Sequence, residues 1–292
     1  MLVEKAEAIC YGAATIINAM ATGKGAAFGV DLWTRAEVRL THEPGVIEGT
    51  ILSDPDESPI LIEETIAAIF NHFGVDREYG AVAKTWSNFP IARGLKSSSG
   101  AANALALATV AALKKRLDDM TLIKLGVNAA IAAKVTVTGA FDDACASYFG
   151  GVVITDNDKR EILGDFSLAE ENLVVLFHVP KQKVYTTSID AARTRVVADF
   201  VKTALKEVLR RNVWSALTLN GLIFSSAFGY ESGRAFDALL AGAVGAGLSG
   251  KGPTVTAVVP LNKIEQVKTA WQKYEGEILE AHINHRKAKV VC

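Results

Sequence analysis

The stretch PIARGLKSSSGAANALALATVAAL, residues 90–113, sets three serines between two glycines and then runs into an alanine-rich segment of helical composition. The first turn of a helix has four N–H groups without intrahelical partners and the positive end of the helix dipole, so it attracts phosphate. Gly94 and Gly100 allow close backbone approach, and Lys96 adds a positive charge. One serine is enough to cap a helix. Three in succession therefore favour a bound anion, with an ordinary capped helix as the alternative.

The bulk composition is that of a globular protein without a strongly charged partner. The chain has 292 residues, 50% of them hydrophobic, which is enough for one large or two medium domains. Its 31 Lys and Arg balance 32 Asp and Glu, so we expect neither nucleic acid nor a membrane as a partner. The three cysteines have no metal-ligand spacing, and no secretory signal is recognisable. These features predict a cytoplasmic protein.

Strand and helix patterns are mixed without regular βα alternation, which predicts the α+β class. We expect a strand over residues 28–40, an amphipathic helix that ends at Gly74 and a helix over residues 121–134 with Thr121 as its cap. Further along, the sequence predicts a strand, LVVLFHVP, a long helical region broken near Asn212, and a final helix over residues 262–285. The residue pattern changes near residue 151, which predicts two domains, residues 1–150 and 151–292.

A second glycine-rich stretch, GAGLSGKGPTVTAVV at residues 245–259, matches two nucleotide-binding patterns only superficially. Gly245, Gly247 and Gly250 fit G-x-G-x-x-G, and Gly250 with Lys251 nearly completes a P-loop. Both motifs need a strand before and a helix after the glycines, whereas here we expect a helical stretch before and a strand after. We therefore reject both motifs, and with them an NAD-dependent oxidoreductase. A glycine loop that lines an active site remains, with a purely structural turn as the alternative.

A third stretch, TGAFDDACASYFGG at residues 138–151, carries two adjacent acids. We expect Asp142 and Asp143 in a loop between two β-rich runs, where one would serve as general base or magnesium ligand. Adjacent side chains point in different directions, so the other would cap a helix or be solvated. A solvated turn is the alternative for both.

Taken in order, the three stretches resemble the GHMP kinase superfamily. Its central motif P-x-x-x-G-L-x-S-S fits residues 90–98, its glycine loop S-G-x-G-P fits residues 249–253, and its acidic loop fits DDACAS before two glycines. The N-terminal stretch GAATIINAMATGKGAAFGVDL, residues 12–32, is similar to the archaeal-type shikimate kinases. The resemblance implies a two-domain GHMP-kinase-like fold whose active site lies in the cleft between the domains.

The resemblance also implies the reaction and its cofactors: ATP with Mg²⁺, and phosphorylation of the 3-hydroxyl of shikimate in aromatic amino acid biosynthesis. The alternative is another GHMP kinase, acting on homoserine or mevalonate. The resemblance also predicts which residues bind the ATP phosphates: Pro90, Ile91, Ala92, Arg93, Gly94, Leu95, Lys96, Ser97, Ser98, Ser99 and Gly100. Ser98 would contact the metal, with Ser97 or Ser99 as substitutes.

The remaining roles follow from the same resemblance. Asp143 would orient or deprotonate the attacking hydroxyl, with Asp142 as the fallback if the register slips by one residue, and Lys24 would lie near the reacting phosphate. The C-terminal domain would close the site through Ser249, Gly250, Lys251 and Gly252.

One departure from the family concerns the metal. Some members carry a magnesium-binding glutamate on a helix before the acidic loop, whereas residues 121–134 offer only Asn128. A non-catalytic nucleotide-binding protein therefore stays an alternative. The candidate cations for the shikimate carboxylate are Arg93, Arg193, Arg195 and Arg234, and nothing in the sequence predicts the oligomeric state.

Overall fold

The structure is a computed structural model that describes residues 4–90, 95–136, 138–168, 172–181 and 191–291. Its first half is built on a seven-stranded sheet in the order β11-β1-β2-β4-β3, with β5 also paired to β2 and β6 paired to β5. The strands are β1 (Lys5–Ile17), β2 (Lys24–Thr41), β3 (Ile47–Ile51), β4 (Gly80–Ser87), β5 (Val152–Asp156), β6 (Glu161–Phe166) and β11 (Lys289–Val290). The strand expected over residues 28–40 lies within β2, as predicted. The mixture of helices with two sheets confirms the α+β class.

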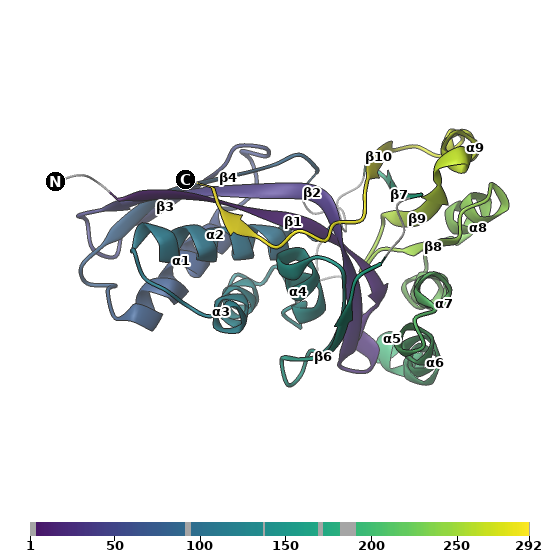
Figure 1. Ribbon diagram of the computed structural model, residues 1–292, viewed down its shortest axis with the longest axis horizontal. Helices are drawn as coiled ribbons and strands as arrows, with labels where there is room; N and C mark the ends of the chain where they lie inside the picture. The colour runs from purple at the N-terminus through teal and green to yellow at the C-terminus, as the bar shows by residue number, and fades with distance from the viewer. Residues whose placement is uncertain (1–3, 91–94, 137, 169–171, 182–190, 292) are drawn as a thin grey trace.

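Four helices cover one face of this sheet (Figure 1): α1 (Ile60–Phe73), α2 (Ser97–Ala112), α3 (Asp119–Ala132) and α4 (Phe141–Phe149). The alanine-rich α2 lies against β1 and β2 and is in contact with the other three helices. Small side chains make this close packing possible: a Cβ atom added at Gly100 would lie 3.2 Å from the carbonyl oxygen of Tyr11. The helix predicted to end at Gly74 does so, and Gly74 takes a left-handed conformation there.

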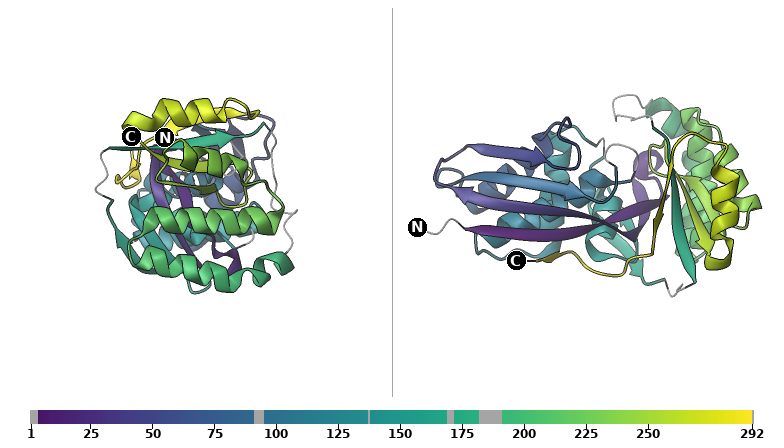
Figure 2. Two further views of the ribbon diagram at one scale, coloured as in Figure 1. Left: turned by 90° about the vertical axis from the view of Figure 1, so that its right-hand side faces the viewer. Right: turned by 90° about the horizontal axis from the view of Figure 1, so that it is seen from above.

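The second half has an antiparallel sheet in the order β10-β7-β9-β8, which is covered by helices (Figure 2). Its strands are β7 (Leu173–Val179), β8 (Gly245–Leu248), β9 (Val255–Pro260) and β10 (Glu277–Ala281). Its helices are α5 (Ala191–Val196), α6 (Ala198–Leu209), α7 (Val213–Phe228), α8 (Gly233–Leu240) and α9 (Ile264–Trp271), with the 3₁₀ turn η3 (Leu261–Lys263) before α9. In the first half, the 3₁₀ turn η1 (Ala19–Ala21) follows β1. The predicted break near Asn212 falls between α6 and α7.

One hydrophobic core runs across both halves. Ile16 and Phe28, from the ends of β1 and β2 that face the second half, pack in a cluster with Phe177 of β7, Leu205 of α6 and Leu217 of α7. Because the halves share this cluster, the residues at the end of β1 have fixed positions relative to the loops of the second half. The first sheet extends through β6 beyond residue 150, and β11 returns to it (Figure 1), while the predicted division at residue 150 stays a prediction.

Three details of the predicted elements are wrong. The final helix ends at Trp271, because Gly276 takes a positive φ of 147° and the following residues pair as β10 with β7. The cap of α3 is Asp118, whose carboxylate accepts from the N–H of Thr121. The short strand β8 immediately precedes the C-terminal glycine loop. The exclusion of the two nucleotide motifs still stands, since β9 rather than a helix follows the loop.

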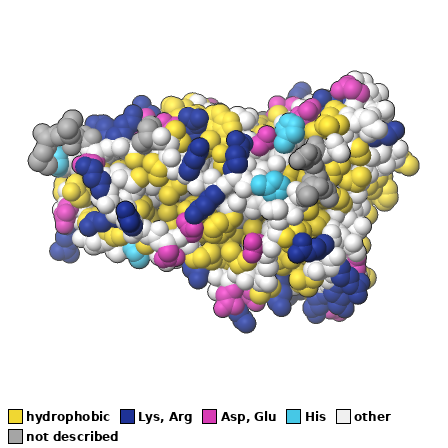
Figure 3. All heavy atoms as spheres, in the orientation of Figure 1, with side chains coloured by type: hydrophobic (Ala, Val, Ile, Leu, Met, Phe, Trp, Pro, Cys, Tyr) yellow, Lys and Arg dark blue, Asp and Glu magenta, His cyan; other side chains and the backbone are white. Residues whose placement is uncertain are grey.

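The surface bears no single dominant charge on the face seen in Figure 3, where acidic and basic side chains are interspersed with hydrophobic ones. In the part of the chain that the structure describes, no helix combines the length and the apolar character needed to cross a bilayer.

Candidate active site

A cavity of about 60 Å³ lies where the two halves meet. It is lined by Thr15, Asn18, Ala19, Met20, Lys96, Thr136, Thr138, Ala140, Asp142, Asp143, Gly250 and Lys251. The end of β1, the start of α2, the start of α4 and the loop between β8 and β9 all contribute to it. The three stretches singled out in the sequence thus converge on one small polar cavity, although more than 100 residues separate Asp143 from Gly250.

Two helices begin at this cavity. The residue that precedes α2, Lys96, and the residue that precedes α4, Ala140, both take left-handed conformations, with φ of 62° and 48°. Each therefore turns the chain sharply, and the free N–H groups of the first helical turn follow immediately. The convergence of two helix starts makes the region electropositive at the backbone level, which suits a phosphate group.

The two aspartates lie in the first turn of α4 and not in the predicted loop. The β-like alternation before Gly139 was misleading, because α4 needs only nine residues and its small side chains let it pack against β1 and β2. Carboxylates in the first turn of a helix are also stabilised by the helix dipole. Their position on a rigid helix fixes the directions of both side chains.

Asp143 forms an ion pair with Lys96, whose Nζ lies 2.7 Å from Asp143 Oδ2. The two side chains are 4% and 15% exposed, so this is a nearly buried pair. Among the described residues, Asp143 Oδ1 and Thr15 Oγ1 are buried without a hydrogen-bond partner. A buried oxygen without a partner costs about 1–3 kcal/mol, so two of them in one cavity indicate a site built for a polar ligand.

Asp142 faces the sheet. Its Oδ1 accepts a hydrogen bond of 2.8 Å from Asn157 Nδ2, and Asn157 Oδ1 accepts in turn from Thr155 Oγ1 at 2.6 Å. Gly25 of β2 makes room for the other carboxylate oxygen, because a Cβ atom there would overlap it. Burial, and secondly the charge of Asp143, raise the pKa of Asp142 to about 7, against the opposing effects of Lys96 and Asn157.

Asn18 was missed by the sequence analysis, although it is the one amide in the apolar run TIINAM. Its Nδ2 donates to the carbonyl oxygen of Gly250 at 3.0 Å, and its own N–H donates to Asn220 Oδ1 at 3.0 Å. Asn18 thereby joins the end of β1 to the glycine loop and to α7. Beside Gly250, the half-buried Lys251 lines the cavity, and burial together with the charge of Lys96 lowers its pKa to about 8.

The three predicted serines do not line the cavity. Ser97 and Ser98 are half-buried and Ser99 is buried in the first turn of α2, next to Lys96. In the glycine loop, the N–H of Gly252 donates to the Ser249 carbonyl. Ile91, Ala92, Arg93 and Gly94 lie outside the described residues.

Of the described candidates, Lys24, Arg193, Arg195 and Arg234 do not line the cavity, and Arg93 lies outside the described residues. Lys24 is exposed at the start of β2, and its predicted role near the phosphate stays a prediction. Arg193 and Arg195 are exposed on α5, which lies beside η1 at the edge of the cavity. The guanidinium carbon of Arg234 instead lies 5.0 Å from the centre of the Tyr274 ring.

The oxygen atoms of the cavity fit a magnesium ion carried by a nucleotide. Mg²⁺ takes one or two carboxylates and completes its octahedron with phosphate oxygens and water. The hydroxyl of Ser98, in the first turn of α2, is the candidate protein ligand, and phosphate oxygens and water would complete the shell. Asn128 on α3 accepts a hydrogen bond from Arg160 and does not line the cavity. Within the described ranges, no three His, Cys, Asp or Glu side chains are grouped so that they could hold a metal ion by themselves.

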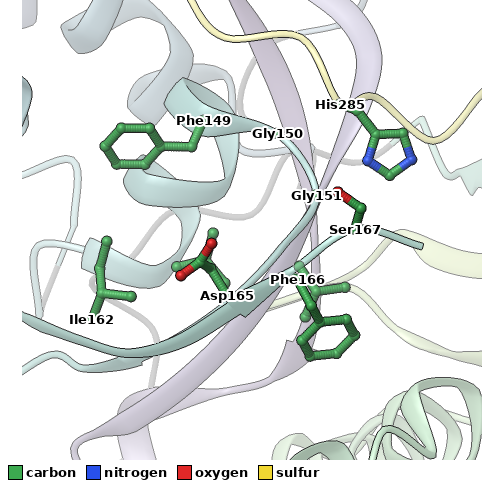
Figure 4. Close-up of a pocket in the computed structure, with 10 residues that line it drawn as sticks. Phe149, Gly150, Gly151, Ile162, Asp165, Phe166, Ser167 and His285 are labelled. Carbon is green, nitrogen blue, oxygen red and sulfur yellow. The ribbon is translucent and has the colours of Figure 1, made fainter. Parts of the chain in front are cut away.

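A larger cavity of about 290 Å³ lies at the opposite end of α4 (Figure 4). Phe149, Asp165, Phe166 and His285 are among its lining residues, and it contains none of the predicted site residues. Size alone therefore does not identify the candidate active site, and the smaller cavity holds the relevant side chains.

Comparison with known proteins points in one direction. The N-terminal domain that defines the GHMP kinase family matches residues 61–151 of this chain. A shikimate kinase of Methanosarcina mazei is 42% identical over 283 residues, which cover 96% of this chain and 95% of that protein. A shikimate kinase of Methanothermobacter thermautotrophicus is 38% identical over an alignment of 298 positions, which covers 100% of this chain and 100% of that protein.

The fold has solved counterparts. The crystal structure of homoserine kinase from Cytophaga hutchinsonii superposes with a TM-score of 0.77 over 99% of this chain and 98% of that chain. Its sequence identity is 18%, so this likeness concerns the fold alone.

Proposed function

The chain belongs to the shikimate kinases of the GHMP kinase family, and from this premise we propose that it transfers the γ-phosphoryl group of ATP to the 3-hydroxyl of shikimate. The products are shikimate 3-phosphate and ADP. The observation that carries this proposal is the buried Asp143 Oδ1, which has no partner among the described residues and lies in a cavity formed by both halves.

Asp143 is the group that receives or orients the acceptor hydroxyl. Its Oδ2 is held by Lys96 and its Oδ1 is available, whereas Asp142 is engaged by Asn157 and faces β2. In the transfer, the acceptor oxygen forms a bond to the γ-phosphorus while the bond from that phosphorus to the β–γ bridging oxygen breaks. The hydroxyl proton passes to Asp143 Oδ1, and the electrons of the broken bond leave with ADP.

The start of α2 binds the phosphates. The free N–H groups at the start of α2 and the hydroxyls of Ser97 and Ser98 in its first turn are the proposed phosphate donors, while Ser99 is buried in the same turn. Ser98, with phosphate oxygens and water, would hold Mg²⁺, which neutralises charge on the phosphates. Phosphoryl transfer needs mainly positioning and charge stabilisation, and a rigid helix start beside a fixed carboxylate provides both.

In this proposal the hydroxyl groups of shikimate lie in the same cavity. Thr15 Oγ1 is buried without a partner among the described residues and suits one of these hydroxyl groups. The carboxylate of shikimate needs a cation. Lys251 lies in the cavity, while Arg193 and Arg195 lie on the neighbouring α5 and stay candidates.

A coupled assay of ADP release tests the proposal, with shikimate, homoserine and mevalonate offered separately to the same preparation. We expect turnover with shikimate and little with the other two alcohols. Turnover with homoserine alone would overturn the acceptor assignment and leave the kinase assignment standing. Binding of ATP without ADP release with any acceptor would overturn the proposed activity as a whole.

A further inference from the structure

We propose that Lys96 is a positioning residue that acts through Asp143, and not a ligand of the ATP phosphates as its place in the phosphate loop suggests. The inference rests on the proposed function, because it names the group that orients the proposed base. Lys96 precedes the first residue of α2, and Asp143 lies in the first turn of α4. Their ion pair is therefore a direct link between the phosphate-binding helix and the helix that carries the base.

The distance and burial of this pair are the first argument. Nζ of Lys96 lies 2.7 Å from Asp143 Oδ2, and both side chains are largely excluded from water. A buried ion pair is costly to separate, because each partner would be left as an uncompensated charge. The ammonium thus holds one oxygen of Asp143 in place, and the other, Oδ1, has no partner among the described residues and could accept a substrate hydroxyl.

The backbone of Lys96 is the second argument. Its φ of 62° is left-handed, a conformation that costs a residue with a Cβ atom roughly 1–2 kcal/mol and costs glycine nothing. A glycine at this position would make the same turn into α2 without strain. Lys114 has the same left-handed backbone outside the cavity, so the strain at Lys96 supports the inference only together with its buried ion pair to Asp143.

The glycine loop of the second half is the third argument. A Cβ atom at Gly250 would lie 3.1 Å from Lys96 Cε and would overlap Nζ. The carbonyl of Gly250 is held at 3.0 Å by Asn18, so the loop cannot move away freely. The loop therefore leaves room for the ammonium of Lys96 beside Asp143, and Lys251 from the same loop supplies a second cation to the cavity.

A double-mutant cycle tests the proposal with the variants Lys96→Met, Lys96→Arg, Asp143→Asn and the double variant Lys96→Met/Asp143→Asn. The matched control is Lys114→Met. Lys114 also has a left-handed φ, of 54°, and an ion pair of 2.6 Å to Glu4, but it is exposed and lies outside the cavity. For each variant, kcat and KM for ATP and for shikimate are measured, together with binding of a non-hydrolysable ATP analogue by calorimetry.

We expect Lys96→Met to lower kcat about 10- to 100-fold, the order found when a reacting group is misplaced, with KM for ATP and affinity for the analogue changed less than threefold. Lys96→Arg recovers part of this kcat because it restores a cation. In the Asp143→Asn background, Lys96→Met changes the residual rate less than twofold. Lys114→Met behaves as the wild type.

Two results would overturn the proposal. One is a tenfold loss of ATP affinity in Lys96→Met with kcat unchanged, which would make Lys96 a phosphate ligand. The other is an effect of Lys96→Met that is equally large with and without Asp143, which would make the two residues independent.

Thermal unfolding separates failure of this proposal from failure of the proposed function. Because Lys96→Met leaves a buried carboxylate alone, its Tm should fall below that of the double variant even if shikimate is not the substrate. A Tm of the double variant at or below that of Lys96→Met would show that the pair is not coupled and would refute the proposal.

Discussion

Replacement of Gly250 by alanine tests the geometry of the site most directly. The new methyl group would lie 3.1 Å from Lys96 Cε and within the space of Nζ, so the ammonium must move away from Asp143. The ion pair now measures 2.7 Å, and a displacement of about 1 Å at a reacting group costs on the order of 100-fold in rate. We expect kcat to fall about 10- to 100-fold.

Alanine at this position also affects stability, because φ of Gly250 is 56°. A left-handed alanine costs roughly 1–2 kcal/mol of folding free energy. Gly229, which ends α7 with φ of 74° and has nothing within 4 Å of an added Cβ atom, is the matched control. Gly229→Ala should lose only the stability that a left-handed alanine costs and should keep its kcat.

The assay is ADP release under saturating ATP and shikimate, with the free energy of unfolding of each variant measured in urea. Gly250→Ala should lose more stability than Gly229→Ala, because it also disturbs the buried ion pair, and only Gly250→Ala should lose turnover. A wild-type kcat in folded Gly250→Ala would refute the reasoning, because it would mean that the place of the Lys96 ammonium beside Asp143 has no bearing on the reaction.

Three further predictions concern the neighbouring side chains. Asp143→Asn should lower kcat by about 10²–10⁴ with ATP binding retained, and Asp142→Asn far less; the reverse ranking in the same kinetic assay would exchange their roles. Ser98→Ala should raise KM for ATP–magnesium more than KM for shikimate, and equal changes would contradict its assignment to the metal. Burial raises the pKa of Asp142 to about 7, so wild-type stability falls as pH rises from about 4 to 7, whereas Asp142→Asn should lack this fall. The stability of the wild type relative to Asp142→Asn, measured in urea at pH 5 and pH 8, should fall by about 2–3 kcal/mol over this range, and an unchanged difference would show that Asp142 is ionised in the native state.

The local structure of the site was largely predictable. Small residues after three serines predicted α2, since nothing else in the segment competes with a helix, and Gly74 ended α1 where the predicted pattern stopped. The two acids were placed in a loop because the alternating residues before them outweighed a short helical pattern. The last helix was predicted too long because residues 277–281 instead pair with the edge of β7, a contact that the local sequence pattern does not reveal.

The sequence by itself determined which three segments to examine together, because a serine run, an acidic pair and a glycine loop occur in it in one order. Only the tertiary structure decided that these segments meet and which of their side chains contact one another. Lys96 and Asp143 are 47 residues apart, and Asn18 and Gly250 are 232 apart. Each pair meets because the sheet, its covering helices and the shared core fix their places. Hydrogen bonds and ion pairs depend on distance in space and on exclusion of water, and neither quantity is written in the order of residues.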